Sequence, residues 1–411
     1  IDCQRSAGCP RSPVLMSGQR RPLTTRQQLL VPATVAVLFV AMVSSFTPTP
    51  LYRLYQDEWG IGDELIGVAF AAYPIAVIIT LVLLGGVSDR FGRRSTLIIA
   101  LLTLLSSMVV LTVAFAYPLL LLGRALQGVA VALAAGAGAA TLMETHPKGV
   151  ARGAFVNTLA LAVGAAVGPL LAGLLASVTP LPLVFPYLTV GSAVLVPLAL
   201  VLRSQDAHRA LTDAPLIRTI RLPRSLWPGF SVAGAAILGT NLAMGMFGSF
   251  GGAIAATVGL LSEFAIGLLV SIVLASLALS QVITRALRPR TAMALGLLAA
   301  AVGWGSAALA SAVGTPWMML VGACLIGAGA GMCLMGSAAL IGIISPVNRR
   351  AEIYSAYLLV AFGALSVLSL LAGFVVQQAS ATAVLTVSFV ICAFLSTFVL
   401  LFSRRLLPAM A

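Results

Sequence analysis

The chain has 411 residues, of which 60% are hydrophobic and only 9% are charged, and its formal net charge is +13. Ordinary soluble domains carry about 25% charged residues, so a soluble globular protein is excluded, because it could not cover this much apolar surface. Nucleic-acid binding is not indicated either, because the basic residues stand in short clusters between apolar runs, as in membrane proteins.

Twelve mainly apolar runs follow one another along the chain, and each approaches or exceeds the roughly 20 residues that a membrane-spanning helix needs. The alternation typical of a membrane β-barrel is absent, and an open sheet would leave unpaired edges in lipid. We therefore expect an all-α membrane protein with twelve transmembrane helices. The predicted helices are 29–49, 65–88, 95–117, 118–142, 153–179, 181–202, 228–250, 264–284, 291–313, 317–344, 353–376 and 381–402.

The longest polar connection divides these helices into six plus six. We expect two six-helix bundles, 29–202 and 228–402, joined by a central cytoplasmic loop at 203–227. A disordered N-terminal tail is predicted at 1–28, and a short C-terminal tail at 403–411. The sequence leaves open whether the protein begins at Ile1 or at Met16, and the first run is too long for a cleaved signal peptide.

The basic residues predict the orientation of the helices. All of the 24 lysines and arginines except Arg53 and Arg124 fall in the two tails or in alternate connections, which the positive-inside rule places in the cytoplasm. We therefore expect a multi-pass protein of a bacterial-type inner membrane with both termini in the cytoplasm, and lipid as its surroundings. The five cysteines form no spaced set typical of a disulfide framework or a metal site, so no metal and no cofactor are expected.

The connection between the second and third predicted helices contains, in order, Gly85, Asp89, Arg90, Gly92, Arg93 and Arg94. This spacing resembles the signature loop of the major facilitator superfamily, Gly-x-x-x-Asp-Arg-x-Gly-Arg-Arg, at its expected place in the chain. The resemblance implies a gating loop that latches the two halves together in the outward-open state. A tight basic turn needed only for topology is the alternative. The matching segment 284–290 lacks the acid and the glycine.

The fourth predicted helix carries Arg124, Gln127 and Gly128, which resemble the Arg-x-x-x-Gly motif of the same superfamily. A charge inside the membrane is costly, so Arg124 should face the bundle interior and a partner. Gln127 and Gly128 share its helix face. Two interpretations stay open: an arginine bonded to backbone carbonyls, or a cavity residue that aids substrate binding or proton coupling. The tenth predicted helix, 317–344, has Ala323 and Ile326 at the positions that match Arg124 and Gln127.

The fifth predicted helix contains Gly164, Gly168, Pro169 and Gly173, with Ala172 between the last two. The pattern resembles the Gly-x-x-x-Gly-Pro-x-x-Gly-Gly motif of antiporters in this superfamily, although Ala172 replaces one glycine. Close helix packing and a proline bend are an equally good explanation.

Two further polar residues stand inside apolar runs. Asn157 and Asn241 either line the transport cavity or bond to a neighbouring helix.

These features predict a secondary transporter that exports a small molecule by alternating access, of the drug:proton antiporter type, with protons as coupling ion. The alternative is an uptake symporter or a facilitator for a sugar or organic acid. More remote is a non-transporting sensor, which would need a sizeable soluble module. An enzyme is not expected, because no HExxH motif, paired intramembrane acids or Ser/His set is present. The resemblance implies a monomer. With Arg124 as the sole charge deep in a predicted span, the interior should prefer neutral or anionic cargo.

Overall fold

A computed structural model of the chain describes residues 27, 29–206, 222–346 and 349–406. Within these residues the secondary structure is helical throughout, and twelve helices are long and apolar enough to cross a membrane. The predicted all-α class is therefore confirmed. The expected tails and the middle of the central loop fall mostly outside the described residues. The elements are α2 (Leu30–Phe46), η1 (Thr49–Leu51), α3 (Tyr52–Trp59), α4 (Asp63–Leu84), α5 (Val87–Phe91), α6 (Arg93–Thr112), α7 (Tyr117–Thr145), α8 (Val150–Val178), α9 (Phe185–Arg203), η2 (Arg224–Leu226), α10 (Trp227–Ala256), α11 (Glu263–Ile283), α12 (Pro289–Val313), α13 (Pro316–Ile344), α14 (Arg350–Gln378) and α15 (Ala381–Leu406).

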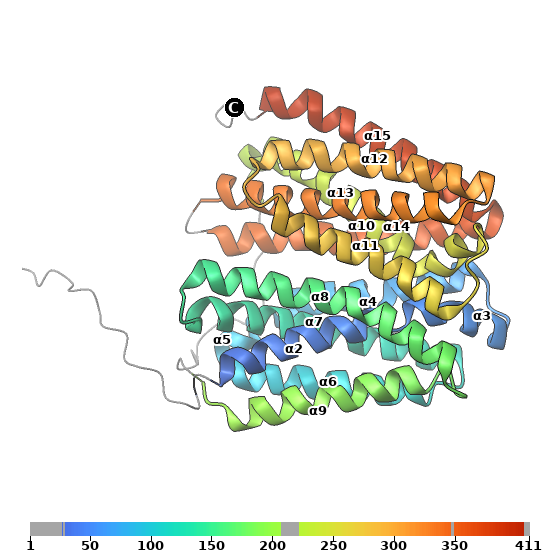
Figure 1. The fold of residues 1–411 in the computed structure, drawn as a ribbon. Helices are drawn as coiled ribbons and strands as arrows, with labels where there is room; N and C mark the ends of the chain where they lie inside the picture. Colours follow the sequence, from blue (N-terminus) through green and yellow to red (C-terminus); the bar gives the residue numbers. More distant parts are fainter. Residues whose placement is uncertain (1–26, 28, 207–221, 347–348, 407–411) are drawn as a thin grey trace, which may run out of the picture.

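The helices form two bundles that lie side by side (Figure 1). The first half contains α2 to α9 and the second half contains η2 to α15. Across the middle, α8 packs against α11 and α4 packs against α14, and these are the main contacts between the halves. For the secondary transporter that the sequence predicts, the substrate path is expected at the boundary between the two halves.

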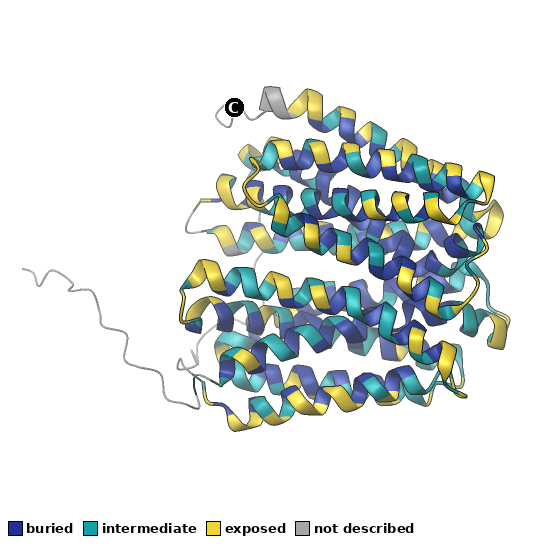
Figure 2. Ribbon diagram, viewed as in Figure 1, coloured by how far each residue is buried: buried dark blue, intermediate teal, exposed yellow. Residues whose placement is uncertain are grey.

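Burial follows the arrangement of a protein surrounded by lipid. Buried residues gather where helices face one another, and exposed residues follow the outer faces of the bundles (Figure 2). Many of the exposed side chains are large and apolar, and Phe115 is 82% exposed. In water this surface would be unfavourable, whereas in a bilayer it contacts acyl chains.

Two ends of the molecule are distinguished by charge. We call the end with the connections 85–92, 146–149, 204–206 and 284–288 and the residues 345–346 and 349 the basic end, which lies at the left in Figure 1. The other end, with the connections 60–62, 113–116, 179–184, 257–262, 314–315 and 379–380, is called the opposite end.

The first span, Leu30–Trp59, is longer than predicted, but it is broken and its regular helix ends early. The apolar run suggested a helix to residue 49, whereas α2 ends at Phe46. Pro48 has no backbone N–H, so the carbonyl of Ser44 has no donor four residues on and accepts from the backbone N–H of Thr47 at 3.3 Å instead. The chain continues through η1 into α3, which ends at Trp59 and is capped by Gly60 in the left-handed region, with φ of 63°. Arg53, expected in a loop, therefore lies in α3.

The seventh span also departs from a regular helix. α10 contains a kink at Phe250, where φ is −115° and ψ is 19°. Phe250 lies beside Gly251 and Gly252, and glycines of this kind permit a bend because they tolerate unusual backbone angles.

Candidate transport site

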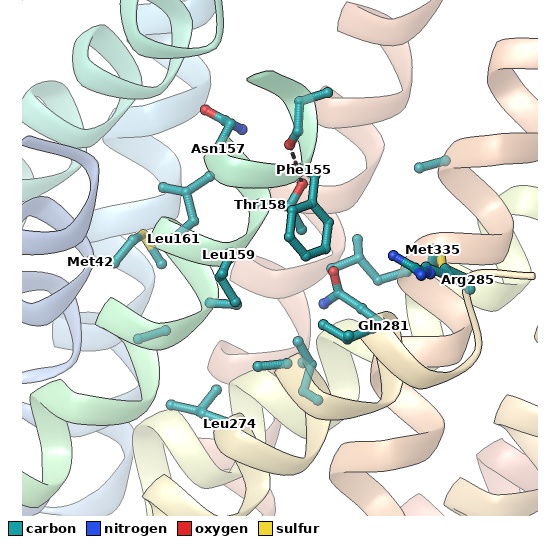
Figure 3. A pocket seen from close by; sticks show the side chains of 18 of the residues that line it. Met42, Phe155, Asn157, Thr158, Leu159, Leu161, Leu274, Gln281, Arg285 and Met335 are labelled. Carbon is teal, nitrogen blue, oxygen red and sulfur yellow. Dashed lines mark hydrogen bonds between the residues drawn. The ribbon is translucent and has the colours of Figure 1, made fainter. Parts of the chain in front are cut away.

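A cavity of about 490 Å³ lies between the two halves (Figure 3). Its walls come mainly from α8 of the first half and from α11 and α13 of the second, with residues of α2, α10 and α14. Arg285 and Tyr354, both exposed, line it at the basic end. The volume is within the range of about 300–1,000 Å³ that is usual for small-molecule sites.

The lining is largely apolar, with polar groups on both halves. Asn157 and Thr158 belong to α8, whereas Gln281 and Arg285 belong to α11 and the turn that follows it. Figure 3 shows Gln281 and Arg285 directed from the second half toward the side chains of α8. Thr158 donates to the carbonyl of Ala154 at 3.1 Å. The amide oxygen of Asn157 is buried without a hydrogen-bond partner.

The structure thus places Asn157 in the cavity wall, which is one of the two positions that the sequence left open. Asn241 corresponds to the other alternative, a side chain that bonds to a neighbouring helix. Its amide donates to the carbonyl of Ala361 on α14 at 2.7 Å, its side chain is buried, and it does not line the cavity.

Arg124 faces the interior of the first half, as its cost in lipid requires, but it is enclosed and lies outside the cavity lining. Its guanidinium donates to the carbonyl of Ser45 at 2.8 Å, to the amide oxygen of Gln127 at 2.6 Å and to the carbonyl of Ala69 at 3.4 Å. The guanidinium carbon also lies 5.4 Å from the centre of the Phe70 ring and 5.0 Å from that of another aromatic residue, Tyr73. The charge is therefore stabilised by carbonyl dipoles and ring faces.

The break in the first span explains this arrangement. Pro48 cannot supply the regular helical donor to the Ser44 carbonyl, which accepts a long bond of 3.3 Å from the backbone N–H of Thr47 and a shorter one of 2.8 Å from the side-chain amide of Gln127. Arg124 and Gln127 therefore connect α7 to the end of α2, and Arg124 also reaches Ala69 of α4. This geometry is the carbonyl-bonded arginine that the sequence left open as one alternative. We call Arg124, Gln127 and the carbonyls they bond the arginine clamp.

The predicted gating loop, residues 85–94, is held by the first half. Arg93 pairs with Asp89 of the same loop and with Glu144 at the end of α7, at 2.8 Å to the second carboxylate. Arg94 bonds the carbonyls of Val201 and Leu202 at the end of α9, at 3.0 and 2.8 Å.

The two glycines of this loop lie at helix ends, and its remaining cation, Arg90, contacts an aromatic ring. Gly92 adopts φ of 92°, a region that favours glycine, and it separates α5 from α6. Arg90 lies over the ring of Phe91, and Gly85 follows the end of α4. The sequence analysis did not identify two acids that hold this loop, Glu144 and Asp206. The carboxylate of Asp206 accepts a hydrogen bond from the backbone N–H of Arg94. The only signal for Glu144 was an acid at a helix end on the basic side.

The glycines of the fifth-helix motif serve two different contacts. A methyl group on Gly164 or Gly168 would lie 2.4 or 2.5 Å from a backbone carbonyl oxygen of α2, in the same half. A methyl group on Gly173 would lie 2.4 Å from the carbonyl oxygen of Glu263 on α11, in the other half. The carbonyl of Pro169 in turn faces Gly267 of α11. The first two glycines pack one bundle, and the third brings the bundles together.

A second close contact joins the halves at the opposite end. A methyl group on Gly67 of α4 would lie 2.8 Å from the carbonyl oxygen of Ser369 on α14, and one on Gly373 would lie 3.0 Å from that of Asp63. The backbone N–H of Asp63 also donates to the side chain of Gln377 at 3.0 Å. The halves are thus in backbone contact at the opposite end, while the cavity separates them toward the basic end.

Among the residues that the structure describes, no three His, Cys, Asp or Glu residues come together as metal ligands.

Comparison with known proteins agrees with this architecture. Residues 34–258 match the family model of the Major Facilitator Superfamily. Over 205 residues the chain is 26% identical to quinidine resistance protein 1 of Saccharomyces cerevisiae, which covers 49% of this chain and 36% of that protein. The match thus spans little more than a third of that relative's length.

Solved structures share the fold at low sequence identity. A bacterial homologue of the human lysosomal transporter Spinster has a TM-score of 0.70 at 16% identity and covers 93% of this chain and 98% of its own. A D-xylose–proton symporter has a TM-score of 0.72 at 17% identity and covers 92% of this chain and 97% of its own.

Proposed function

The chain belongs to the major facilitator superfamily, and from this membership we propose that it is a secondary transporter that exports a small molecule across the inner membrane by alternating access. The observation that carries the proposal is the asymmetry of the boundary between the halves. A cavity of small-molecule size separates them toward the basic end, and backbone contacts join them at the opposite end.

The basic end is assigned to the cytoplasm, since four of its five connections carry basic residues, and positive charge favours this side. The described conformation then has its cavity on the cytoplasmic side. A substrate entering near Arg285 and Tyr354 would lie between α8, α11 and α13. Release outside requires the contacts of Gly173 and Gly67 to separate and the basic ends to approach.

The gating loop fits the second part of this cycle. It lies on the first half at the basic end, and its arginines are paired with groups of that half. When the basic ends approach, this rigidly held basic surface would meet the second half. This supports the latch role that the motif implies, in a state other than the one described.

We further propose that protons drive export by antiport. The fifth-helix motif resembles that of antiporters, and the relative from yeast is named for resistance to quinidine. Asp63 and Glu64 are the acids whose surroundings change when α4 separates from α14, because both lie at that contact. Glu64 has one carboxylate oxygen that is buried without a hydrogen-bond partner. We regard the working unit as a monomer, since one chain supplies both halves.

Everted and right-side-out membrane vesicles from an efflux-deficient host test export directly. With a panel of dyes and antibiotics, an exporter loads everted vesicles in an energy-dependent manner, and a protonophore abolishes the loading. Loading of right-side-out vesicles alone would indicate uptake instead, the direction of a symporter or facilitator. No movement in either orientation, with the protein present in the membrane, would contradict the proposal for this panel.

A further inference from the structure

The charge in the described cavity lining is positive. Among its described lining residues, Arg285 is the one cation, and no aspartate, glutamate or histidine is present. Arg152, in the first turn of α8, lies over the ring of Phe155, which lines the cavity. A positive charge in a partly enclosed apolar site attracts anions and repels cations, more strongly than it would in water.

The apolar part of the lining suits a variable hydrophobic body. Met42, Met244 and Met335 come from α2, α10 and α13, and Leu274 and Phe155 add to the same surface. Methionine side chains are unbranched and flexible, so they adapt to ligands of different shape.

Along α11 the polar and apolar lining residues follow one another in order. Arg285 lies in the turn after α11 at the basic end, and Gln281 lies in the last turn of that helix. Leu274 is about two helical turns farther along α11 from Gln281, away from the basic end. A ligand with an acid group at one end and an apolar body would match this order.

We propose that the cavity binds an amphipathic organic anion, with its acid group at Arg285 and Gln281 and its apolar body among the methionines. The physiological meaning of this site rests on the proposed transport function, whereas binding itself does not. The chemistry also suits export, because an inside-negative membrane potential favours the outward movement of an anion.

The competing explanation for Arg285 is topology alone, since basic residues mark this end of every span. Arg288 provides the matched control. It stands in the same connection, is exposed in the same way and does not line the cavity. Topology requires only that both residues be positive, whereas a binding role distinguishes them.

Binding is measured on the full chain in nanodiscs of zwitterionic lipid, with empty nanodiscs subtracted. The probes are 11-(dansylamino)undecanoic acid, its neutral amide, and the corresponding alkylamine as the cation. We expect the acid to bind more tightly than the amide and the amine. Arg285→Gln should weaken acid binding by about threefold to tenfold, the range for one partly exposed charged contact. Arg285→Lys should restore part of the preference, and Arg288→Gln should leave it intact.

Several results would overturn the inference. These are equal binding of acid and amide, tighter binding of the amine, no binding of any probe, or equal losses in Arg285→Gln and Arg288→Gln. Thermal unfolding in the same nanodiscs confirms that each variant is folded. Transport in proteoliposomes separates this inference from the proposed function. A protein that binds the acid and transports no probe would contradict transport alone, and one that transports only the amine would contradict this inference alone.

Discussion

The closure at the opposite end makes Gly173 the sharpest test of the alternating-access model. A methyl group at this position would lie 2.4 Å from the carbonyl oxygen of Glu263, about 1 Å closer than ordinary van der Waals contact, which begins near 3.4 Å. The clashing atom belongs to the backbone of a helix, so a side chain cannot rotate away. In Gly173→Ala, α8 and α11 must therefore separate at this end.

The size of the effect follows from known costs of overpacking. Such clashes cost about 1–3 kcal/mol in well-packed sites. If the contact is lost when the halves separate at this end, the whole cost falls on the described conformation. The equilibrium would then shift toward the other conformation by about 5- to 150-fold, since about 1.4 kcal/mol is a factor of ten.

Distances between spin labels on the two halves measure this shift. Leu181 and Leu261 are exposed at the opposite end, one on each half, and accept labels after substitution by cysteine in a background without the native cysteines. Double electron–electron resonance should show a larger population at long distance in Gly173→Ala than in the parent.

Two matched variants serve as controls for Gly173→Ala. Gly136→Ala places a methyl group where no atom lies within 4 Å, and it should leave the distance distribution unchanged. Gly164→Ala creates an equal clash of 2.4 Å within the first half, so it should lower thermal stability without lengthening the distance between halves. If Gly173→Ala gives the same distribution as Gly136→Ala, the proposed role of this contact in closure is refuted.

Three further substitutions test other parts of the structure. Arg124→Leu removes the donors to the Ser45 and Ala69 carbonyls and should cost about 1–3 kcal/mol; a melting temperature in detergent equal to that of the parent would contradict the clamp. Glu144→Gln breaks a partly exposed ion pair and should change stability by less than about 1 kcal/mol, while transport slows if the loop works as a latch; unchanged transport rates would exclude Glu144 from that role. Glu64→Gln should abolish transport driven by a pH gradient in proteoliposomes but leave substrate exchange without a gradient; a normal response to the gradient would place proton coupling elsewhere.

Hydropathy was sufficient to predict the helices, because a membrane imposes a length and a composition on every span. It could not place the end of the first helix, because the apolar run continues through Pro48 and Pro50. These prolines were a usable signal for the break. Contacts between helices were harder to predict, because nothing in the sequence marked Ser44 and Ser45 as partners of α7.

The candidate site was predicted only in part for a similar reason. Asn157 and Asn241 look alike in sequence, and their different roles depend on which helix each one faces. Arg124 was expected inside the bundle, and it is there, but the charge that lines the cavity is Arg285. Its connection was interpreted from a degenerate motif, and the sequence does not show that the turn after α11 directs this side chain inward.

The arginine clamp has a mechanical consequence. It fastens α2, α4 and α7 to one another through a charged group. We therefore expect the first half to move as a rigid body. The second half carries Ala323 and Ile326 where Arg124 and Gln127 would stand, and its α10 is bent at Phe250. Compliance during the transport cycle should therefore be concentrated in the second half, where the amide protons of α10 would exchange with solvent faster than those of α7.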